Sequence, residues 1–202
     1  MVAALILAAG GSRRFGSQKL LAPFGGKPLL EHAIDNASES SVQRLLCVLG
    51  SDADEITAGV AFGRAETLTC EEWRLGQSAA LRAAVSELSS SEAIVVLLGD
   101  EPLVTADAIE RVLGARGPGA CAVRATYGAV PGHPTVIEKA LFPKVAQISG
   151  DSGAKDLFSP SETRYVPCDD CASAFDIDTP ADLELLERNF TVTPPERKGH
   201  QC

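Results

Sequence analysis

The stretch that decides the fold is AALILAAGGSRRFGSQK, residues 3–19. Its first six residues are apolar and predict a buried strand over residues 3–8. The remainder holds several glycines and cations: Gly10, Gly11, Gly16, Arg13, Arg14 and Lys19. A strand that runs directly into a glycine-rich, positively charged turn is typical of a site for an anion, most often a phosphate.

Apolar runs and helical patterns alternate along the rest of the chain. The apolar runs predict strands over residues 44–50, 65–70, 93–100, 120–128 and 163–168. The helical patterns cover residues 28–37 and 78–88, a segment from Thr105 to about Leu113, and a segment that starts with a capping box at Thr179 and Asp182. This alternation predicts an α/β fold with a mostly parallel sheet covered on both faces. Ligands of such sheets bind at the carboxyl ends of the strands.

Length and charge limit the classes of protein that fit. The 202 residues predict one domain, over residues 1–190, followed by a polar tail over residues 191–202. The formal net charge of −9 argues against partners such as nucleic acids or a membrane surface. The first thirty residues nevertheless carry four cations and no acid, which favours a small polyanionic ligand. The apolar start has no basic region before it, so we expect no signal peptide and a cytoplasmic location.

The six cysteines do not form a metal or disulfide pattern. Cys47, Cys70 and Cys121 lie in or beside apolar runs and are predicted to be reduced core residues. Cys168 and Cys171 form a single CDDC motif. Because no second pair accompanies it, we interpret the motif as a reduced surface turn rather than a zinc or redox site.

Two familiar glycine motifs are excluded for residues 7–19. A P-loop requires lysine directly after its last glycine, but Ser17 follows Gly16. A dinucleotide fingerprint requires G-x-G-x-x-G, which the chain does not have here, so an NAD-dependent oxidoreductase is disfavoured. The loop can still bind phosphate through backbone N–H groups at Gly10 and Gly11, with Arg14 as a bidentate donor and Lys19 as a point charge. The alternative is a plain turn with solvated cations.

The segment LAAGGSRRFGSQK resembles the L-A-A-G-x-S-x-R-M-G-x-x-K signature of the molybdopterin-nucleotide type of NTP transferases (the MobA-like family). Phe15 stands where methionine is usual. The resemblance implies a Rossmann-like three-layer sandwich of the nucleotide-diphospho-sugar transferase (GT-A-like) type. It also implies that Arg14 and Lys19 are catalytic and contact the NTP phosphates. The loop that wraps the triphosphate would be Leu7, Ala8, Ala9, Gly10 and Gly11.

Asp100 follows a strongly apolar run and precedes Pro102. A carboxylate at a strand end suits Mg²⁺, which binds one or two carboxylates together with phosphate oxygens. The alternative is an aspartate that begins a turn. LLGDEPLV resembles the family's L-G-D-x-P-L-V segment, whose aspartate binds magnesium, although glutamine is more usual at the position of Glu101.

FDIDTPADL, residues 175–183, supplies a second acidic cluster. Alternation in an extended segment places Asp176 and Asp178 on one face, where both could complete a metal site or one could cap the following helix. The segment is similar to the family's D-I-D-T-P-E-D-L. The resemblance implies that one of these aspartates joins Asp100 on Mg²⁺, and we expect Asp176 to be the ligand and Asp178 to support it.

Gly76, Gln77 and Ser78 precede a helix, where they could read a nucleotide base or, in the case of Ser78, simply cap the helix. The stretch resembles the G-x-S-x-S-L-R-x-G segment of molybdenum cofactor cytidylyltransferases, with Ala80 in place of the second serine. The G-P-L-A-G segment of guanylyl-transferring relatives is absent. Leu75 stands where isoprenoid cytidylyltransferases have arginine.

Residues 132–158 are similar to the cytidylyl family's G-H-P-V-L-F…L-x-G-D-x-G-A-R segment. On their own, residues 132–134 predict a turn. The resemblance implies that His133, Asp151 and Lys155 bind the acceptor, with Lys155 in place of the usual arginine.

We therefore expect Mg²⁺-dependent transfer of CMP from CTP to the phosphate of molybdopterin, with release of pyrophosphate. The resemblance also implies a transfer partner among molybdoenzyme maturation proteins. The alternatives are transfer of GMP, transfer to another small phosphorylated acceptor, and a binding module that senses nucleotide without turnover.

Overall fold

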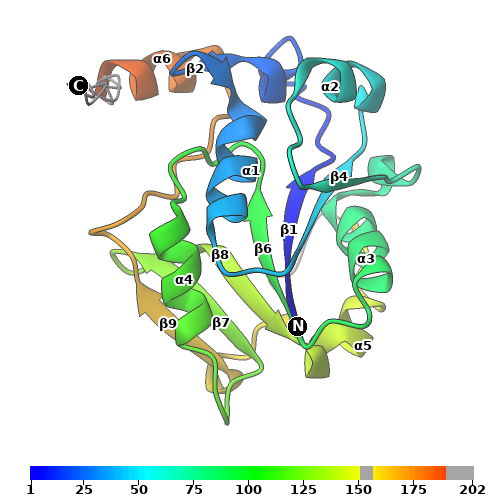
Figure 1. Cartoon of the computed structure of the whole chain (residues 1–202), viewed down its shortest axis with the longest axis vertical. Helices are drawn as coiled ribbons and strands as arrows, with labels where there is room; N and C mark the ends of the chain where they lie inside the picture. Colours follow the sequence, from blue (N-terminus) through cyan, green and yellow to red (C-terminus); the bar gives the residue numbers. More distant parts are fainter. Residues whose placement is uncertain (151–156, 190–202) are drawn as a thin grey trace, which may run out of the picture.

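A computed structural model describes residues 1–150 and 157–189 of the chain (Figure 1). Its centre is a seven-stranded sheet. The strands of this sheet are β1 (Val2–Ala8), β4 (Arg44–Leu49), β5 (Glu66–Thr69), β6 (Ala93–Leu98), β7 (Ala122–Tyr127), β8 (Val130–Glu138) and β9 (Thr163–Pro167). Their order across the sheet is β5-β4-β1-β6-β8-β7-β9. A separate small hairpin consists of β2 (Pro23–Phe24) and β3 (Lys27–Pro28).

Most strands of the sheet run in the same direction. β1 pairs in parallel with β4 and β6, β4 with β5, and β7 with β9. β8 is antiparallel to both of its neighbours. The prediction of a mostly parallel sheet is therefore confirmed, and the carboxyl ends of β1 and β6 lie together at one edge of the sheet.

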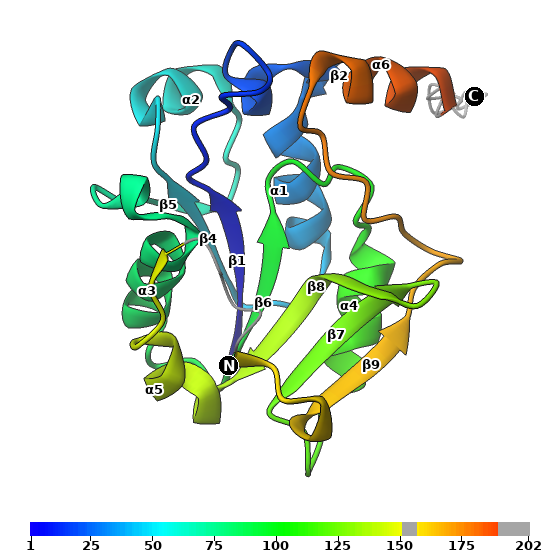
Figure 2. The ribbon, with the colours of Figure 1, turned by 180° about the vertical axis from the view of Figure 1, so that it is seen from behind.

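Helices cover both faces of the sheet, which gives three layers (Figures 1 and 2). Residues of α1 (Leu29–Glu39), α2 (Ala53–Gly59) and α4 (Ala106–Gly114) pack into one core cluster, whereas α3 (Gln77–Glu87) and α5 (Phe142–Val145) pack into the other. The last helix, α6 (Pro180–Asn189), lies beside the β2-β3 hairpin, at the top of Figure 1. None of the helices in residues 1–150 and 157–189 is long and apolar enough to span a membrane.

The central strand shows why the apolar runs are continuous rather than alternating. Ala3, Ala4, Leu5 and Ile6 of β1 are all 0% exposed, because helices cover the sheet on both sides. Ala4 and Ile6 contribute to one core cluster, and Ala3 and Leu5 to the other. A strand that is buried on both faces has no position for a polar side chain, so its sequence is uniformly apolar.

Two of the predicted helix starts are confirmed by their hydrogen bonds, whereas Ser78 does not cap α3, whose N-cap is Gly76. The Thr105 hydroxyl accepts from the backbone N–H of Ala108 at 3.3 Å at the start of α4. At the start of α6, Asp182 Oδ2 accepts from the backbone N–H of Thr179 at 2.7 Å, and the Thr179 hydroxyl accepts from the N–H of Asp182 at 3.3 Å. This reciprocal pair is a capping box. It fixes the point at which the chain turns after Asp178.

The prediction of a turn at residues 132–134 is wrong, because these residues lie inside β8. The two prolines, Pro131 and Pro134, precede the part of β8 that pairs with β6, which begins at Thr135. Proline lacks the N–H that a central strand donates. The proline-containing half of β8 pairs with β7 instead, across an irregularity between Arg124 and Thr126.

The prediction of a surface turn at the CDDC motif is also wrong in part. Both thiols are free, but Cys168 is 0% exposed and belongs to the core cluster that contains α1 and α4. Its backbone N–H donates to Thr126 at 3.0 Å, directly after β9 ends. Burial raises the pKa of the Cys168 thiol to about 11, which keeps the thiol protonated. The motif thus anchors the chain after β9 through a buried side chain.

Candidate active site

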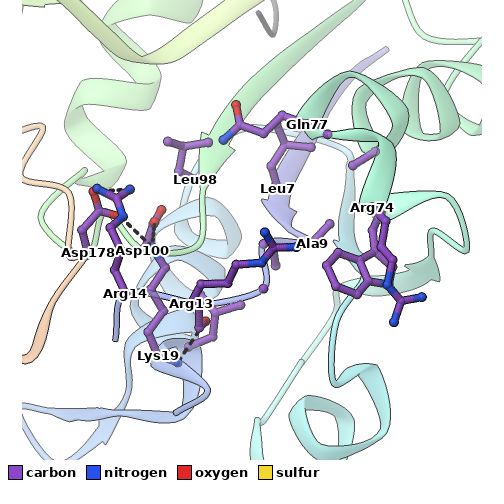
Figure 3. Close-up of a pocket in the computed structure, with 18 residues that line it drawn as sticks. Leu7, Ala9, Arg13, Arg14, Lys19, Arg74, Gln77, Leu98, Asp100 and Asp178 are labelled. Atoms are coloured by element: carbon purple, nitrogen blue, oxygen red, sulfur yellow. Dashed lines mark hydrogen bonds and ion pairs between the residues drawn. The ribbon is translucent and has the colours of Figure 1, made fainter. Parts of the chain in front are cut away.

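A cavity of about 420 Å³ opens at the carboxyl ends of β1 and β6 (Figure 3). Its lining comes from the loop after β1, from the segment before α3, from the end of β6 and from the segment before α6. The residues that line the cavity are Leu7, Ala8, Ala9, Gly10, Gly11, Ser12, Arg13, Arg14, Lys19, Leu20, Trp73, Arg74, Gly76, Gln77, Ala80, Leu98, Asp100 and Asp178.

Side chains within the loop after β1 hold it in place. The Ser12 hydroxyl accepts from the backbone N–H of Lys19 at 3.2 Å and donates to Gln18 Oε1 at 2.9 Å. Gln18 Nε2 in turn donates to Asp52 Oδ2 at 3.0 Å, which ties the loop to the start of α2. These bonds place Lys19 at the start of a short 3₁₀ turn, Lys19–Leu21. These bonds therefore hold the backbone at Lys19 in place.

Glycine allows the loop to approach Trp73 closely. A Cβ atom on Gly50 would lie 2.6 Å from the Ala9 carbonyl oxygen and 2.7 Å from Trp73 Cβ. A Cβ on Gly11 would lie 3.2 Å from the Trp73 ring. Residue 50 must therefore be glycine for β4, the loop and Trp73 to pack as they do. The indole ring consequently forms one wall of the cavity, and the Arg74 guanidinium lies over it at 4.7 Å from the ring centroid.

The opposite wall is a network of charges. Lys19 Nζ donates to the Asp100 carboxylate, to the Ile177 carbonyl oxygen at 2.9 Å and to Asp178 Oδ1 at 3.4 Å. Arg14 pairs with the other oxygen of Asp178, Oδ2, at 2.9 Å. The strand end at Asp100 is tied to the same segment by the backbone N–H of Ile177, which donates to the Asp100 carbonyl at 3.2 Å. Figure 3 shows Arg14, Lys19, Asp100 and Asp178 gathered on this side.

The donor set fits a hard divalent cation that is shared with a phosphate ligand. Within residues 1–150 and 157–189, no group of three or more His, Cys, Asp or Glu side chains is placed to hold a metal by itself. Asp100 and Asp178 together offer two carboxylates beside the Ile177 carbonyl, and all three groups already receive hydrogen bonds from one ammonium group. Mg²⁺ binds through such a small oxygen set when substrate phosphates and water supply the remaining ligands.

Beside this network lies a second acidic cluster, which does not line the cavity. Glu101 is 3% exposed, and its Oε1 lies 3.4 Å from His133 Nδ1. Burial opposes ionisation of Glu101, but the facing His133 and a hydrogen bond with Asp176 together lower the pKa of the Glu101 carboxyl. Burial and then the neighbouring Glu101 raise the pKa of Asp176 to about 7. Asp176 therefore faces Glu101 and His133, whereas Asp178 faces Lys19 and Arg14.

The structure brings most of the predicted nucleotide residues together. All of the predicted loop residues line the cavity, as do Gly76 and Gln77 at the start of α3. Ser78 does not, because its side chain is 0% exposed and its Oγ lies 3.4 Å from Arg82 Nη1. Figure 3 shows Gln77 reaching over Leu7, on the opposite side of the cavity from Lys19.

Arg13 and the Trp73–Arg74 pair also line the cavity and were not predicted to do so. Arg13 neighbours the predicted Arg14, and its guanidinium lies beside Ala9 in Figure 3. The positive charge of residues 1–30 was the available signal for Arg13. For Trp73, the only signal was its position three residues before Gly76 of the Gly-Gln-Ser segment.

Of the three residues predicted to bind the acceptor, only His133 can be placed. Asp151 and Lys155 lie outside the described residues. The His133 side chain is 25% exposed, and its backbone carbonyl accepts from the Tyr127 hydroxyl at 2.7 Å. His133 thus contacts Glu101, the residue that directly follows Asp100.

A cationic loop after β1, two facing carboxylates and a three-layer α/β fold together define a nucleotidyltransferase. Comparison with known proteins agrees with this class. The profile of the MobA-like NTP transferase domain matches residues 4–166, so the chain belongs to the MobA-like NTP transferase family.

Two curated relatives show how far the similarity extends. The chain is 28% identical over 189 residues to nicotine blue oxidoreductase of Paenarthrobacter nicotinovorans, an alignment that covers 88% of this chain and 92% of that protein. It is 37% identical over 115 residues to the bifunctional protein GlmU of Paraburkholderia phymatum. That match covers 56% of this chain and only 25% of the GlmU protein.

Solved structures match over nearly the whole chain. The Mycobacterium sp. strain JC1 homologue of Mycobacterium tuberculosis Rv0371c is 30% identical, with a TM-score of 0.82, and 94% of this chain aligns with 96% of that chain. Rv0371c itself was solved as a complex with manganese; it is 26% identical, with a TM-score of 0.79, and 92% of this chain aligns with 97% of that one.

Proposed function

We propose that the protein transfers CMP from CTP to the phosphate of molybdopterin in a Mg²⁺-dependent reaction that releases pyrophosphate. The observation that carries this proposal is the charge network of the cavity. Cations from the loop after β1 meet carboxylates from the end of β6 and from the segment before α6 at a single point. Lys19 and Asp178 are 159 residues apart in the sequence, so the fold itself assembles the site.

The loop residues would bind and orient the triphosphate. The backbone of Gly10 and Gly11 can approach the phosphates closely, since neither residue has a side chain to separate them from the ligand. Arg14 and Lys19 would neutralise the charge that develops on the pyrophosphate leaving group, and Arg13 adds a third cation to the cavity. Phosphoryl transfer of this kind depends on positioning and charge neutralisation and needs no covalent protein nucleophile.

Asp100 and Asp178 would hold Mg²⁺, with the Ile177 carbonyl beside them. When bound, the metal supplies Lewis-acid stabilisation of the phosphate oxygens at the reacting centre. The manganese complex of Rv0371c supports a divalent cation in a related protein. Lys19 must leave the two carboxylates when the triphosphate binds, and the phosphates then provide its new partner.

The choice of CTP and of molybdopterin is supported by the segment before α3 and by family membership. Gly76 and Gln77 line the cavity on the side opposite Lys19, where the base of a nucleotide would lie if its phosphates contact the loop. The amide of Gln77 can both donate to and accept from a pyrimidine edge. His133 contacts Glu101, next to Asp100 in the sequence, and would bind the second substrate there. We place the reaction in the cytoplasm, with a molybdoenzyme maturation protein as the recipient of the product.

The test is a substrate panel. Purified protein is mixed with CTP, GTP or ATP, with and without Mg²⁺ and molybdopterin, and pyrophosphate release is measured. We expect release with CTP only when both Mg²⁺ and molybdopterin are present. Faster release with GTP would assign the guanylyl reaction. Tight CTP binding in a thermal-shift assay without any release would indicate a nucleotide-sensing module and contradict the proposed transfer.

A second candidate is a redox reaction, favoured by the 28% identity to nicotine blue oxidoreductase over most of both chains. The same panel separates it from transfer when NADH and an oxidised dye are included. Oxidation of NADH that is independent of CTP, together with no pyrophosphate release, would assign a redox function. The transfer proposal expects the opposite pattern.

A further inference from the structure

Arg124 is a half-buried arginine in the middle of β7 whose charge the described residues do not balance. Its Nε is buried and has no hydrogen-bond partner among those residues. Burial lowers the pKa of the guanidinium. The Arg124 guanidinium carbon lies 4.8 Å from the centroid of the Phe158 ring. The ring contacts one face of the guanidinium but does not satisfy its N–H groups.

The other arginines of the described chain show how unusual this is. Those outside the nucleotide cavity each donate to at least one carboxylate, carbonyl or hydroxyl: Arg44, Arg64, Arg82, Arg111, Arg116, Arg164 and Arg188. Arg13 and Arg74, which make no such bond among the described residues, line the cavity that we assign to the nucleotide. A buried donor without an acceptor is costly, so proteins keep few of them.

The register of the sheet places Arg124 on the same face as the nucleotide cavity. Arg124 pairs with Thr135 of β8, and Thr135 pairs with Val96 of β6. Because residues two apart share a face of a strand, His133 and Leu98 are the next residues on this face toward the cavity. Leu98 lines the cavity. Neighbouring strands lie about 4.8 Å apart, so β7 is roughly 10 Å from β6, well within the combined reach of a small substrate and an arginine side chain.

From this placement we infer that Arg124 binds an anionic oxygen group of the second substrate, a phosphate or a similar oxyanion. The inference rests on the proposed transferase function for the identity of that substrate, but the anion site itself can be tested separately. A guanidinium offers parallel N–H donors that match two oxygens of a phosphate. Arg124 and His133 would then contact the acceptor from two adjacent strands, while the nucleotide occupies the cavity on the other side of Leu98.

The anion site is tested by NMR of the arginine Nε–H groups with inorganic phosphate as the probe. The resonance of Arg124 is identified by its loss in the Arg124→Lys variant. We expect this resonance to shift saturably as phosphate is added, whereas that of Arg44, which pairs with Glu66 and Glu87, stays in place. A resonance of Arg124 that moves no more than that of Arg44 would overturn the inference. This result does not depend on whether the protein transfers CMP.

The link to the second substrate is tested by kinetics. Loss of a charge-assisted hydrogen bond should raise KM for molybdopterin about 10- to 100-fold in Arg124→Gln, while KM for CTP stays within about twofold. The Arg124→Lys variant should recover part of the affinity because it keeps the charge. Arg111→Gln is the matched control, since Arg111 pairs with Asp170 at the surface, beside α4, and it should leave both KM values unchanged.

Two outcomes would contradict the role of Arg124 in substrate binding. One is an equal rise in KM for both substrates, or an unchanged KM for molybdopterin, in a variant whose thermal unfolding matches the wild type. The other is that Arg124→Gln lowers the midpoint of thermal unfolding while Arg124 shows no response to phosphate, which would identify a purely structural role. If the wild type releases no pyrophosphate at all, the proposed transfer fails, and the NMR titration alone decides whether Arg124 binds an anion.

Discussion

Two pairs of carboxylates lie side by side in this protein, and they differ in what surrounds them. Asp100 and Asp178 line the cavity and pair with Lys19 and Arg14. Glu101 follows Asp100 directly, and Asp176 is two residues before Asp178, yet these two acids face each other and His133 away from the cavity.

The comparison teaches that the neighbours of a carboxylate, rather than its place in a motif, determine what it can do. Asp100 and Asp178 are neutralised by the side chains of Lys19 and Arg14. When a metal and a triphosphate bind, the metal can take the place of these cations on the carboxylates, and the cations can pair with the phosphates. A buried pair in which one acid keeps its proton is held by its own hydrogen bond and gains nothing from a ligand. We therefore propose that the first pair takes part in the chemistry and that the second supports the site.

The largest effect should come from replacing the acids one at a time. Asp100→Asn and Asp178→Asn should each reduce pyrophosphate release about 100-fold or more, because a ligand of the central cation is lost. Asp176→Asn should cost less than about tenfold, since asparagine can donate to Glu101 as a protonated aspartate does. Steady-state rates with saturating CTP and molybdopterin measure the difference. A loss in Asp176→Asn as large as that in Asp178→Asn would reverse the roles of the two pairs.

The second effect concerns the cation that the first pair already holds. Lys19→Met removes the ammonium group between Asp100 and Asp178, so the affinity for Mn²⁺ in the absence of nucleotide should rise about tenfold or more. Transfer should fall in the same variant. Titration of free Mn²⁺ by electron paramagnetic resonance measures the affinity. Lys27→Met, which removes a lysine paired with Asp35, is the control and should change neither quantity; an unchanged Mn²⁺ affinity in Lys19→Met would contradict the geometry.

The third effect is a pH dependence that only the buried pair should produce. The pKa of Asp176 rises from 3.8 in the unfolded chain to about 7 in the folded protein, so between these pH values the folded state holds a proton that the unfolded state has released. The free energy of unfolding should therefore fall as the pH rises from about 4 to about 7. Denaturant titrations across this range should show a shallower fall in Asp176→Asn. An identical slope in wild type and variant would show that Asp176 is ionised in the folded protein.

The smallest effect should come from Glu101→Gln, which places the residue more usual in the family at this position. The carboxamide can donate to Asp176 and still accept from His133, so Asp176 no longer needs its proton. We expect pyrophosphate release within about threefold of the wild type and a midpoint of thermal unfolding within a few degrees. The readout specific to Glu101 is the pH dependence of stability, which should weaken as it does in Asp176→Asn. A loss of more than about tenfold in rate would show that the negative charge of Glu101 acts in the reaction.

The parallel half of the fold could be predicted from the sequence because its strands are buried on both faces. β1 and β6 consist entirely of apolar residues, a pattern that strongly favours buried strands when it is this short and is followed by glycine. β8 was missed because its first half contains two prolines and a glycine, which locally favour a turn. Its pairing with β7 alone in that half depends on the register of the whole sheet, which no local pattern encodes.

The same division holds for the site. The position of the cationic loop and of Asp100 at the cavity could be predicted because the loop follows β1 and Asp100 lies just after β6, both apolar strands. The choice between Asp176 and Asp178 could not, because alternation places their side chains alike in an extended segment. In the structure, the two aspartates differ in their neighbours. Asp176 faces Glu101, after the end of β6, and His133 of β8, whereas Asp178 pairs with Arg14 of the loop after β1. Trp73 likewise could not be predicted to form a wall of the cavity, because its position depends on packing against Gly50, a tertiary contact.

The order in which the chain is made has a consequence for when the protein becomes competent. Asp178 and the Ile177 carbonyl, the partners of Lys19 across the site, leave the ribosome more than 150 residues after Lys19 does. Until the capping box at Thr179 directs α6 onto the β2-β3 hairpin, Lys19 and Arg14 have no partner from this segment. A chain that lacks this segment would therefore have the cationic loop and Asp100 but not Asp178. Docking of α6 would complete the site.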